Sequence, residues 1–169
     1  IMYTMDMAYL RVLEVQGIVP TVVAGHSLGQ YAALTAAGIL TYRDTCKLIK
    51  ERSRLMSEIQ ETGALCAITS NHMDYDFISE KCKEIREAQN EHLSIALYNS
   101  NRQIVVGGNK GSIQLFEESM KQYPEYGAKT LAVGQAFHTE VMNNMLNDFR
   151  EIVDNVDIKL AKKKVILNC

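Results

Sequence analysis

The sequence lacks the features that mark several large classes of protein. No apolar run in its 169 residues approaches about 18 residues, so no transmembrane span is expected. The first residues, 1–6, lack the basic and then apolar form of a signal peptide. The formal net charge of −2 provides no general attraction to nucleic acid or to a membrane. We therefore expect a cytoplasmic protein without nucleic-acid or membrane partners.

Cysteine is scarce and scattered. None of the four cysteines has CxxC spacing, and none lies beside a histidine in a ligand-like pattern. Reduced thiols in a cytosolic protein are the simple interpretation, and no structural metal site is predicted. The four are Cys46, Cys66, Cys82 and Cys169.

The remaining composition is that of an ordinary globular protein, with 47% hydrophobic and 22% charged residues. Its length suits one compact domain or one and a half. The chain begins without an initiator methionine and ends on an apolar run, residues 165–169, that is typical of a strand or its exit. We expect a chain truncated at both ends.

The first third of the chain predicts alternating helices and a buried strand. Apolar residues at helical spacing predict a helix over residues 2–16 that ends at Gly17. A short β-branched run at 21–24 predicts a buried parallel strand, and residues 30–37 predict a helix capped by Gly38. Thr41 is the predicted N-cap of a further helix that runs to about residue 59, with Asp44 as its acidic partner.

The order of the predicted elements changes after Gly63. The predicted order is β-α-β-β-α-β, which is the ferredoxin-like plan. A helix at 139–153 and a last strand at 165–169 then return to the framework. We therefore predict a partial core of residues 1–61 and 135–169 with a subdomain inserted at 62–134. The subdomain elements are expected at 64–69, 74–89, 93–98, 103–106, 112–123 and 128–133.

Residues 25–29, Gly-His-Ser-Leu-Gly, fit the G-x-S-x-G pattern between a predicted strand and a predicted helix. In an α/β-hydrolase-like core with a parallel sheet, such a serine sits on a sharp, strained turn that exposes its hydroxyl. The pattern assigns Ser27 as a nucleophile and the Leu28 N–H as an oxyanion donor. The competing interpretation is a glycine-rich turn with an incidental serine.

Residues 25–34, followed by Ala37 and Gly38, resemble the active-site motif of malonyl-CoA:acyl carrier protein transacylases and of the acyltransferase domains of polyketide and fatty acid synthases. Three further segments resemble that family in order along the chain. Residues 51–56 are similar to its R-G-x-x-M segment, 99–108 to its N-x-P-x-Q-x-V-x-S-G stretch and 136–142 to its A-F-H-S-x-x-M segment.

The chain also departs from the family pattern. Gln30 stands where the family usually has Glu, Ser53 replaces a glycine, and Thr139-Glu140 replaces Ser-Pro. None of these changes removes a catalytic group. The resemblance further implies a loop before Ile1 that supplies a second oxyanion N–H, and a segment after Cys169 that orients the histidine.

A base must activate the serine, and four histidines are available. His26 is interpreted as a turn residue, and His72 and His92 as exposed. On the residues alone, His138 is either a base or a core histidine. The resemblance favours the base, held by a backbone carbonyl rather than by an Asp, so no third acid is nominated.

The resemblance assigns Arg52 as the clamp for the free carboxylate of a malonyl group, because a guanidinium binds a carboxylate through two parallel hydrogen bonds. On the bare sequence, Arg52 and Arg54 are both ordinary charges on a helix. The resemblance also implies substrate contacts for Met56, Asn99 and Phe137.

The implied reaction is ping-pong transfer of malonyl from malonyl-CoA to the phosphopantetheine thiol of an acyl carrier protein, through an ester on the serine. No metal or redox cofactor is required, since CoA and phosphopantetheine belong to the substrates. The rivals are an acyl hydrolase of the same fold, a non-catalytic carrier-protein docking domain and, more weakly, a lipase or esterase. Residues 162–164, three lysines, are either a docking patch for the acidic carrier or a solvated strand edge.

Overall fold

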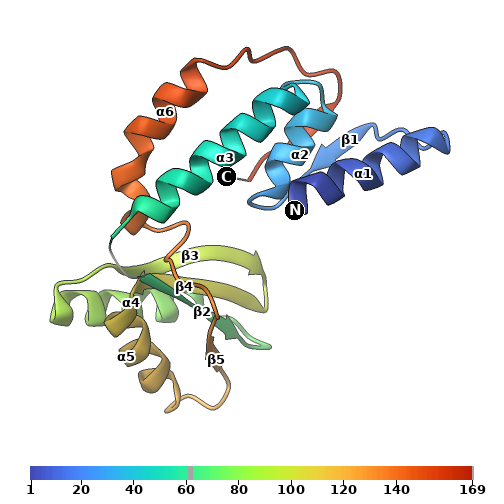
Figure 1. Cartoon of the computed structure of the whole chain (residues 1–169). Coiled ribbons are helices and arrows are strands. Elements are labelled where there is room, and N and C mark those ends of the chain that lie inside the picture. Colours follow the sequence, from blue (N-terminus) through green and yellow to red (C-terminus); the bar gives the residue numbers. More distant parts are fainter. Residues whose placement is uncertain (61–62, 169) are drawn as a thin grey trace. The chain divides into compact units, whose positions relative to one another are not determined.

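The computed structural model describes residues 1–60 and 63–168. They form two compact units, Ile1–Leu55 with Asp148–Cys169, and Met56–Asn147. Figure 1 labels most of the helices and strands of both units. Within the described part of the chain, no helix is long and apolar enough to cross a membrane.

The first unit combines helices with a two-stranded parallel sheet. Strand β1 (Val22–Ala24) pairs with β6 (Lys164–Ile166), so that Val23 lies opposite Val165. Helix α2 (Gly29–Ala36) follows β1 directly and packs against α1 (Met2–Val15). Helix α3 (Tyr42–Glu58) comes next, and α6 (Leu146–Asp154) leads back towards β6. This is an α/β arrangement with a parallel sheet, as predicted.

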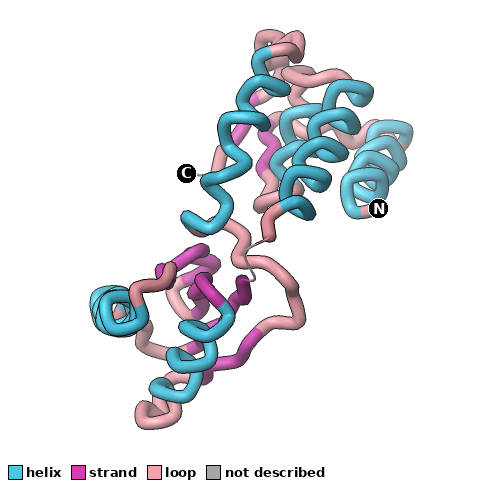
Figure 2. The backbone as a smooth tube through the Cα atoms, turned by 60° about the vertical axis from the view of Figure 1, so that its left-hand side comes forward, coloured by secondary structure: helices cyan, strands magenta, loops and turns pink. Residues whose placement is uncertain are grey.

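The second unit is built on a four-stranded antiparallel sheet with the order β3-β4-β2-β5. Figure 2 shows its strands in magenta and its helices in cyan. The element order along the chain is β-α-β-β-α-β, as the sequence predicts. The elements are β2 (Gly63–Thr69), α4 (Tyr75–Gln89), β3 (Leu93–Ser100), β4 (Gln103–Asn109), α5 (Lys110–Met120) and β5 (Gly127–Thr130).

The core of the second unit lies between the sheet and its two helices. Alternate residues of β2 and β4 point to one face of the sheet, among them Ile68 and Ile104, both fully buried. They pack with Ile78 of α4 and with Phe116 of α5 in one hydrophobic cluster. The period of two in the strands and the apolar faces of the helices therefore meet in a single core.

Local chemistry sets the ends of the helices where the sequence predicted it. The Thr41 Oγ1 accepts a hydrogen bond from the Asp44 N–H at 3.1 Å and donates to the Asp44 carboxylate at 2.5 Å. The first of these bonds satisfies an N-terminal N–H that has no partner within the helix itself. Gly17 and Gly38 follow helices with positive φ angles of 80° and 77°, a conformation that favours glycine. The predicted caps are confirmed.

The helix predicted at 139–153 is wrong in its first half. Residues Glu140–Met145 form a 3₁₀ helix, η1, and the α-helix begins only at Leu146. The physical reason lies just upstream, where Thr139 is extended and His138 has a positive φ of 62°. The chain enters the helix through a tight turn, in which the Met142 N–H donates to the Thr139 carbonyl at 3.0 Å.

The boundaries between the compact units lie at residues 55/56 and 147/148, whereas the sequence predicted boundaries at 61/62 and 134/135. The difference arises because Met56 and Ile59 pack with Ala136, Val141 and Met142 in the second unit. Hydrophobic contacts thus join the two connecting segments to each other within the second unit. The predicted boundary at 61/62 and the predicted strand residue Cys169 lie outside the described residues.

We expect Thr41→Ala to lower the free energy of unfolding by about 1 kcal/mol, because it removes the side-chain cap of α3. Urea denaturation of the full-length protein measures this change. Thr4→Ala is the matched control, since Thr4 is exposed within α1. Equal effects of the two substitutions would contradict the capping role.

Candidate active site

The chain turns sharply at Ser27, between β1 and α2. Ser27 has a φ of 51°, in the left-handed region that residues other than glycine rarely adopt. The turn is closed by backbone bonds from the Gly29 N–H to the His26 carbonyl at 2.9 Å and from the Gln30 N–H to the Ser27 carbonyl at 3.1 Å. A strained strand-to-helix turn is therefore present at the predicted nucleophile.

The two glycines of the motif have different roles. A Cβ added to Gly25 would lie 2.0 Å from the Gly29 carbonyl oxygen, a contact that no side chain can make. A Cβ on Gly29 itself would meet nothing within 4 Å outside its own helix backbone. The sequence pattern gives both glycines the same function, and that interpretation is wrong for Gly29. Only Gly25 is required by the close approach of the backbone across the turn.

Leu28 lies at the start of α2 with helical angles, φ −58° and ψ −32°. A backbone N–H at the first turn of a helix points away from the helix body and has no partner within the helix. That orientation suits an oxyanion donor, and the role of Leu28 stays a prediction. His26 is exposed and its carbonyl closes the turn, which fits its interpretation as a turn residue.

Asn168 contacts both sides of the turn, and sequence reasoning missed it. Its Nδ2 group donates to the Gly25 carbonyl and, at 2.9 Å, to the Gln30 Oε1. Its backbone N–H also donates to the Gln30 Oε1 at 3.2 Å. The signal that could have found it is the parallel pairing of two strands, because residues that follow parallel strands meet at one edge of the sheet.

Arg52 and Arg54 lie in different surroundings on α3. The Arg54 Nε bonds to the Glu51 carboxylate at 2.8 Å, and 47% of the Arg54 side chain is exposed. Arg52 is half-buried and lies near Tyr31, four residues after Ser27. Burial raises the pKa of the Tyr31 phenol, and the positive charge of Arg52 opposes that rise. Arg52 thus lies close enough to α2 for its charge to act on Tyr31, and its role as a clamp stays a prediction.

His138 lies in the second unit, in a segment that is tightly held. Ala136 is fully buried, and the Thr139 hydroxyl donates to the Ala136 carbonyl at 2.7 Å. A Cβ on Gly107 of β4 would lie 2.6 Å from the Thr139 methyl group, so only glycine leaves room for this segment. His138 itself is exposed and has a left-handed φ, so it is no core histidine of this unit. Packing on both sides fixes the backbone of the predicted base.

Two of the predicted substrate-binding residues meet beside that segment. Met56 and Phe137, both half-buried, pack against the cluster of Ala136, Val141 and Met142. This cluster joins the end of α3 to the segment that carries the predicted base.

The remaining predicted substrate-binding residue, Asn99, lies elsewhere in the same unit. It is near the end of β3, where its Nδ2 donates to the Gln103 Oε1 at 3.2 Å. Gln103 lies four positions before Gly107, which packs on the His138 segment, and these four steps span roughly 13 Å of extended chain. Asn99 therefore lies well away from the His138 segment.

The other histidines and the lysine cluster considered from the sequence make contacts elsewhere in the chain. His72 and His92 are exposed, as expected, and the His92 Nδ1 lies 3.2 Å from the Glu140 carboxylate. The Lys163 Nζ donates to the Ala36 carbonyl at 2.9 Å and lies 4.0 Å from the Glu14 carboxylate. Lys163 thus stabilises the end of α2, and the three lysines do not form one free basic patch.

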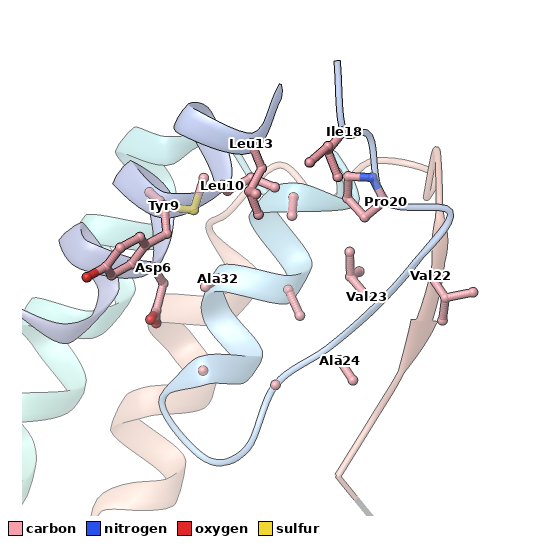
Figure 3. Close-up of a pocket in the computed structure, with 15 residues that line it drawn as sticks. Asp6, Tyr9, Leu10, Leu13, Ile18, Pro20, Val22, Val23, Ala24 and Ala32 are labelled. Atoms are coloured by element: carbon pink, nitrogen blue, oxygen red, sulfur yellow. The ribbon is translucent and has the colours of Figure 1, made fainter. Parts of the chain in front are cut away.

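A pocket of about 560 Å³ lies in the first unit, between α1, β1 and α2 (Figure 3). Its walls are largely apolar, with Leu10, Leu13 and Val23 among the lining residues, and Asp6 is a charged residue of its lining. Gly25 and Gly29 border it, but Ser27, Leu28 and Arg52 do not. We assign it no part in the chemistry.

The predicted site residues therefore form two groups, one in each compact unit. The first unit brings Ser27 and Leu28 into one turn. In the same unit, Arg52 of α3 lies near Tyr31, which belongs to α2. The second unit contains His138, with Phe137 and Met56 packed against the neighbouring hydrophobic cluster, and Asn99 apart from them. The pairing of Ser27 with His138 stays a prediction.

Comparison with known proteins gives one family match over nearly the whole chain. A family model described as "Acyl transferase domain" matches residues 2–167. The chain is 34% identical over 167 residues to the malonyl CoA-acyl carrier protein transacylase of Bacillus subtilis, covering 98% of the chain and 52% of that protein. It is 32% identical to the polyketide synthase GfsA of Streptomyces halstedii over 98% of the chain and 2% of that protein.

Solved structures show the same similarity. FabD from Acinetobacter baumannii matches with a TM-score of 0.91 and 31% identity, over 98% of the chain and 53% of that structure. A malonyl-transacylase in complex with a type II polyketide acyl-carrier protein matches with a TM-score of 0.87 and 28% identity, over 95% of the chain and 52% of that structure. The chain thus spans about half the length of these transacylases.

The unequal glycines of the turn generate a test. Gly25→Ala should destabilise the turn and slow covalent labelling of Ser27 by a fluorophosphonate in the full-length protein, because its methyl group would overlap the Gly29 carbonyl. Gly29→Ala should leave both the labelling rate and the melting temperature close to wild type, since alanine favours a helix more than glycine does. Equal sensitivity at the two positions would refute the distinction.

Proposed function

Because the chain belongs to the acyl transferase domain family, we propose that it carries the nucleophile and the base of a malonyl-CoA:acyl carrier protein transacylase. The full-length protein transfers malonyl from CoA to the phosphopantetheine thiol of an acyl carrier protein through an ester on Ser27. The observation that carries this proposal is the left-handed Ser27 at a turn that only Gly25 permits. Backbone strain of this kind persists where the surrounding structure enforces it, and it concentrates at functional sites.

The first half-reaction acylates the serine. His138 accepts the proton of the Ser27 hydroxyl while the serine oxygen attacks the thioester carbonyl of malonyl-CoA. The Leu28 N–H stabilises the oxyanion of the tetrahedral intermediate. When the intermediate collapses, the C–S bond breaks and the His138 proton passes to the departing CoA sulfur. Malonyl remains as an ester on Ser27.

The second half-reaction reverses these roles. The carrier's pantetheine thiol gives its proton to His138 and its sulfur attacks the seryl ester, after which the C–O bond breaks and Ser27 regains the proton. No resident cofactor is involved, since CoA and phosphopantetheine enter as parts of the substrates. The similarity to a malonyl-transacylase solved with its acyl-carrier protein supports this choice of acceptor.

Arg52 is the proposed determinant of donor choice. The residue is half-buried, and its charge acts electrostatically on Tyr31, within α2, whose first turn follows Ser27. A guanidinium in that position can bind the free carboxylate of a malonyl group through two hydrogen bonds, which an acetyl group cannot form. Met56 and Phe137 supply apolar contacts in the proposal, and Asn99 a contact with a distant part of the donor.

The nucleophile and base are tested together by intact-mass and peptide analysis of the full-length protein with malonyl-CoA. One malonyl group should appear on Ser27, and Ser27→Ala should abolish it and lower turnover by at least ~10³-fold. His138→Ala should slow acylation severely, whereas His72→Ala, at another exposed histidine, should have little effect. Labelling at another residue, or equal effects of the two histidine substitutions, would overturn the assignment.

Donor choice is tested by competition between malonyl-CoA and acetyl-CoA for Ser27. Arg52→Ala should lower the use of malonyl-CoA alone. Loss of a buried charged pair costs ~2–5 kcal/mol, and the partial exposure of Arg52 places the expected loss near the lower end, about 30-fold. Arg54→Ala is the control, because Arg54 pairs with Glu51 on the surface. If Arg52→Ala keeps the preference for malonyl, the clamp is wrong and the acyl hydrolase becomes the better interpretation.

A further inference from the structure

We propose that Asn168 is a positioning residue for the nucleophile. Its side chain holds the strained turn at Ser27 through hydrogen bonds from another segment of the chain. This inference rests on the proposed role of Ser27. The side-chain amide of Asn168 has two N–H groups, and it donates to the Gly25 carbonyl and to the Gln30 Oε1. Gly25 precedes Ser27 by two residues and Gln30 follows it by three. One side chain therefore ties the strand end to the first turn of the helix across the nucleophile.

The bonds from Asn168 differ in kind from the other bonds of the turn. The backbone bonds that close it join residues three positions apart, such as Gln30 and Ser27. Asn168 is 138 residues from Gln30 and 143 from Gly25. It follows β6, which pairs with β1 immediately before the turn, with Ile166 opposite Ala24. The sheet thus places a third segment against a turn whose central residue has a rarely adopted conformation.

Gln30 takes part through its oxygen alone. Its Oε1 accepts from the Asn168 Nδ2 at 2.9 Å and from the Asn168 backbone N–H at 3.2 Å. A carboxylate at position 30 offers the same acceptor with a stronger charge. A carboxylate at position 168, by contrast, would place an oxygen where the Asn168 Nδ2 now donates. That oxygen would be repelled by the Gly25 carbonyl and by the Gln30 Oε1, because all three are acceptors. The two isosteric exchanges, Gln30→Glu and Asn168→Asp, therefore have opposite expected effects.

Asn168 is exposed, which decides what its loss should change. Water can replace an exposed hydrogen bond, so the contribution of this residue to overall stability is small. The position of the Ser27 hydroxyl is more sensitive, because a small displacement of a reacting group lowers a rate strongly. The expected signature is a slower nucleophile in a protein of nearly unchanged stability.

The test measures the rate of fluorophosphonate labelling of Ser27, the kcat and KM for malonyl-CoA, and the melting temperature of the full-length protein. Asn168→Asp should slow labelling and lower kcat by about 10- to 100-fold, with the KM within about twofold of wild type. Gln30→Glu should retain wild-type labelling. Asn155→Asp is the matched control, because Asn155 is an exposed amide that donates to the Glu151 carbonyl at 2.7 Å in the same unit.

The two substitutions also provide an internal check. With Gln30 present, its amide can rotate and donate to an aspartate at position 168, which relieves one of the two opposed contacts. The carboxylate that Gln30→Glu introduces offers no such donor. The double variant Asn168→Asp with Gln30→Glu should therefore be slower than Asn168→Asp alone, although Gln30→Glu by itself is harmless.

Each outcome decides the proposal. Labelling by Asn168→Asp within twofold of wild type overturns it, as does a lower melting temperature with an unchanged labelling rate of the folded protein. If Asn168→Asp does not fold, Asn168→Ala removes the same donors without adding a charge, and it should slow labelling about 10-fold. A wild-type protein whose Ser27 is not labelled would instead refute the proposed function, and the role of Asn168 with it.

Discussion

The proposed nucleophile depends on a close approach of the backbone between Gly25 and Gly29. A side chain at residue 25 would overlap the Gly29 carbonyl, so glycine there allows β1 to turn at once into α2. The same turn forces Ser27 into the left-handed region and places it at the start of the helix. Such a conformation is unfavourable for serine by roughly 1–3 kcal/mol, so packing and hydrogen bonds elsewhere must maintain it. In the first unit that support comes from the parallel pairing of β1 with β6 and from Asn168 beyond it.

The predicted base is held by the same physical means in a different setting. His138 also has a positive φ, and it follows Ala136, which is fully buried. Gly63 and Gly107 make room for this segment, because a Cβ on either would collide with Ala136 or with Thr139. Both proposed reacting residues thus sit on backbone that is fixed by glycines and close packing. In both turns, close backbone packing holds a residue with a positive φ angle.

Much of the architecture could be predicted because its signals are local. The helical spacing of apolar residues, the caps at Thr41 and Gly38 and the β-branched runs each act over a few positions, and the corresponding elements are present. The failures occur where distant packing overrides local preference. The predicted helix at 139–153 begins as a 3₁₀ turn because the chain leaves a left-handed His138 and buries Val141 and Met142 against Met56. The same contacts assign residues 56–60 and 135–147 to the second unit, whereas the sequence pattern placed them in the core.

For the site, the elbow follows from the sequence without further information, since five consecutive residues contain the glycine, the serine and the helix start that the turn requires. Resemblance also distinguished Arg52 from Arg54, and their surroundings differ accordingly. The folded chain was needed to show that Gly25 rather than Gly29 is indispensable, and that Asn168 reaches the elbow. The folded chain was also needed to show that Lys163 donates to a carbonyl at the end of α2, since the sequence left a basic docking patch at 162–164 open. The difference between the two glycines depends on the backbone path within one turn, which a pattern of residue types does not record. Asn168 and Lys163 depend on which segment lies opposite them, and strand pairing across about 140 positions fixes that neighbour in a way that no local pattern records.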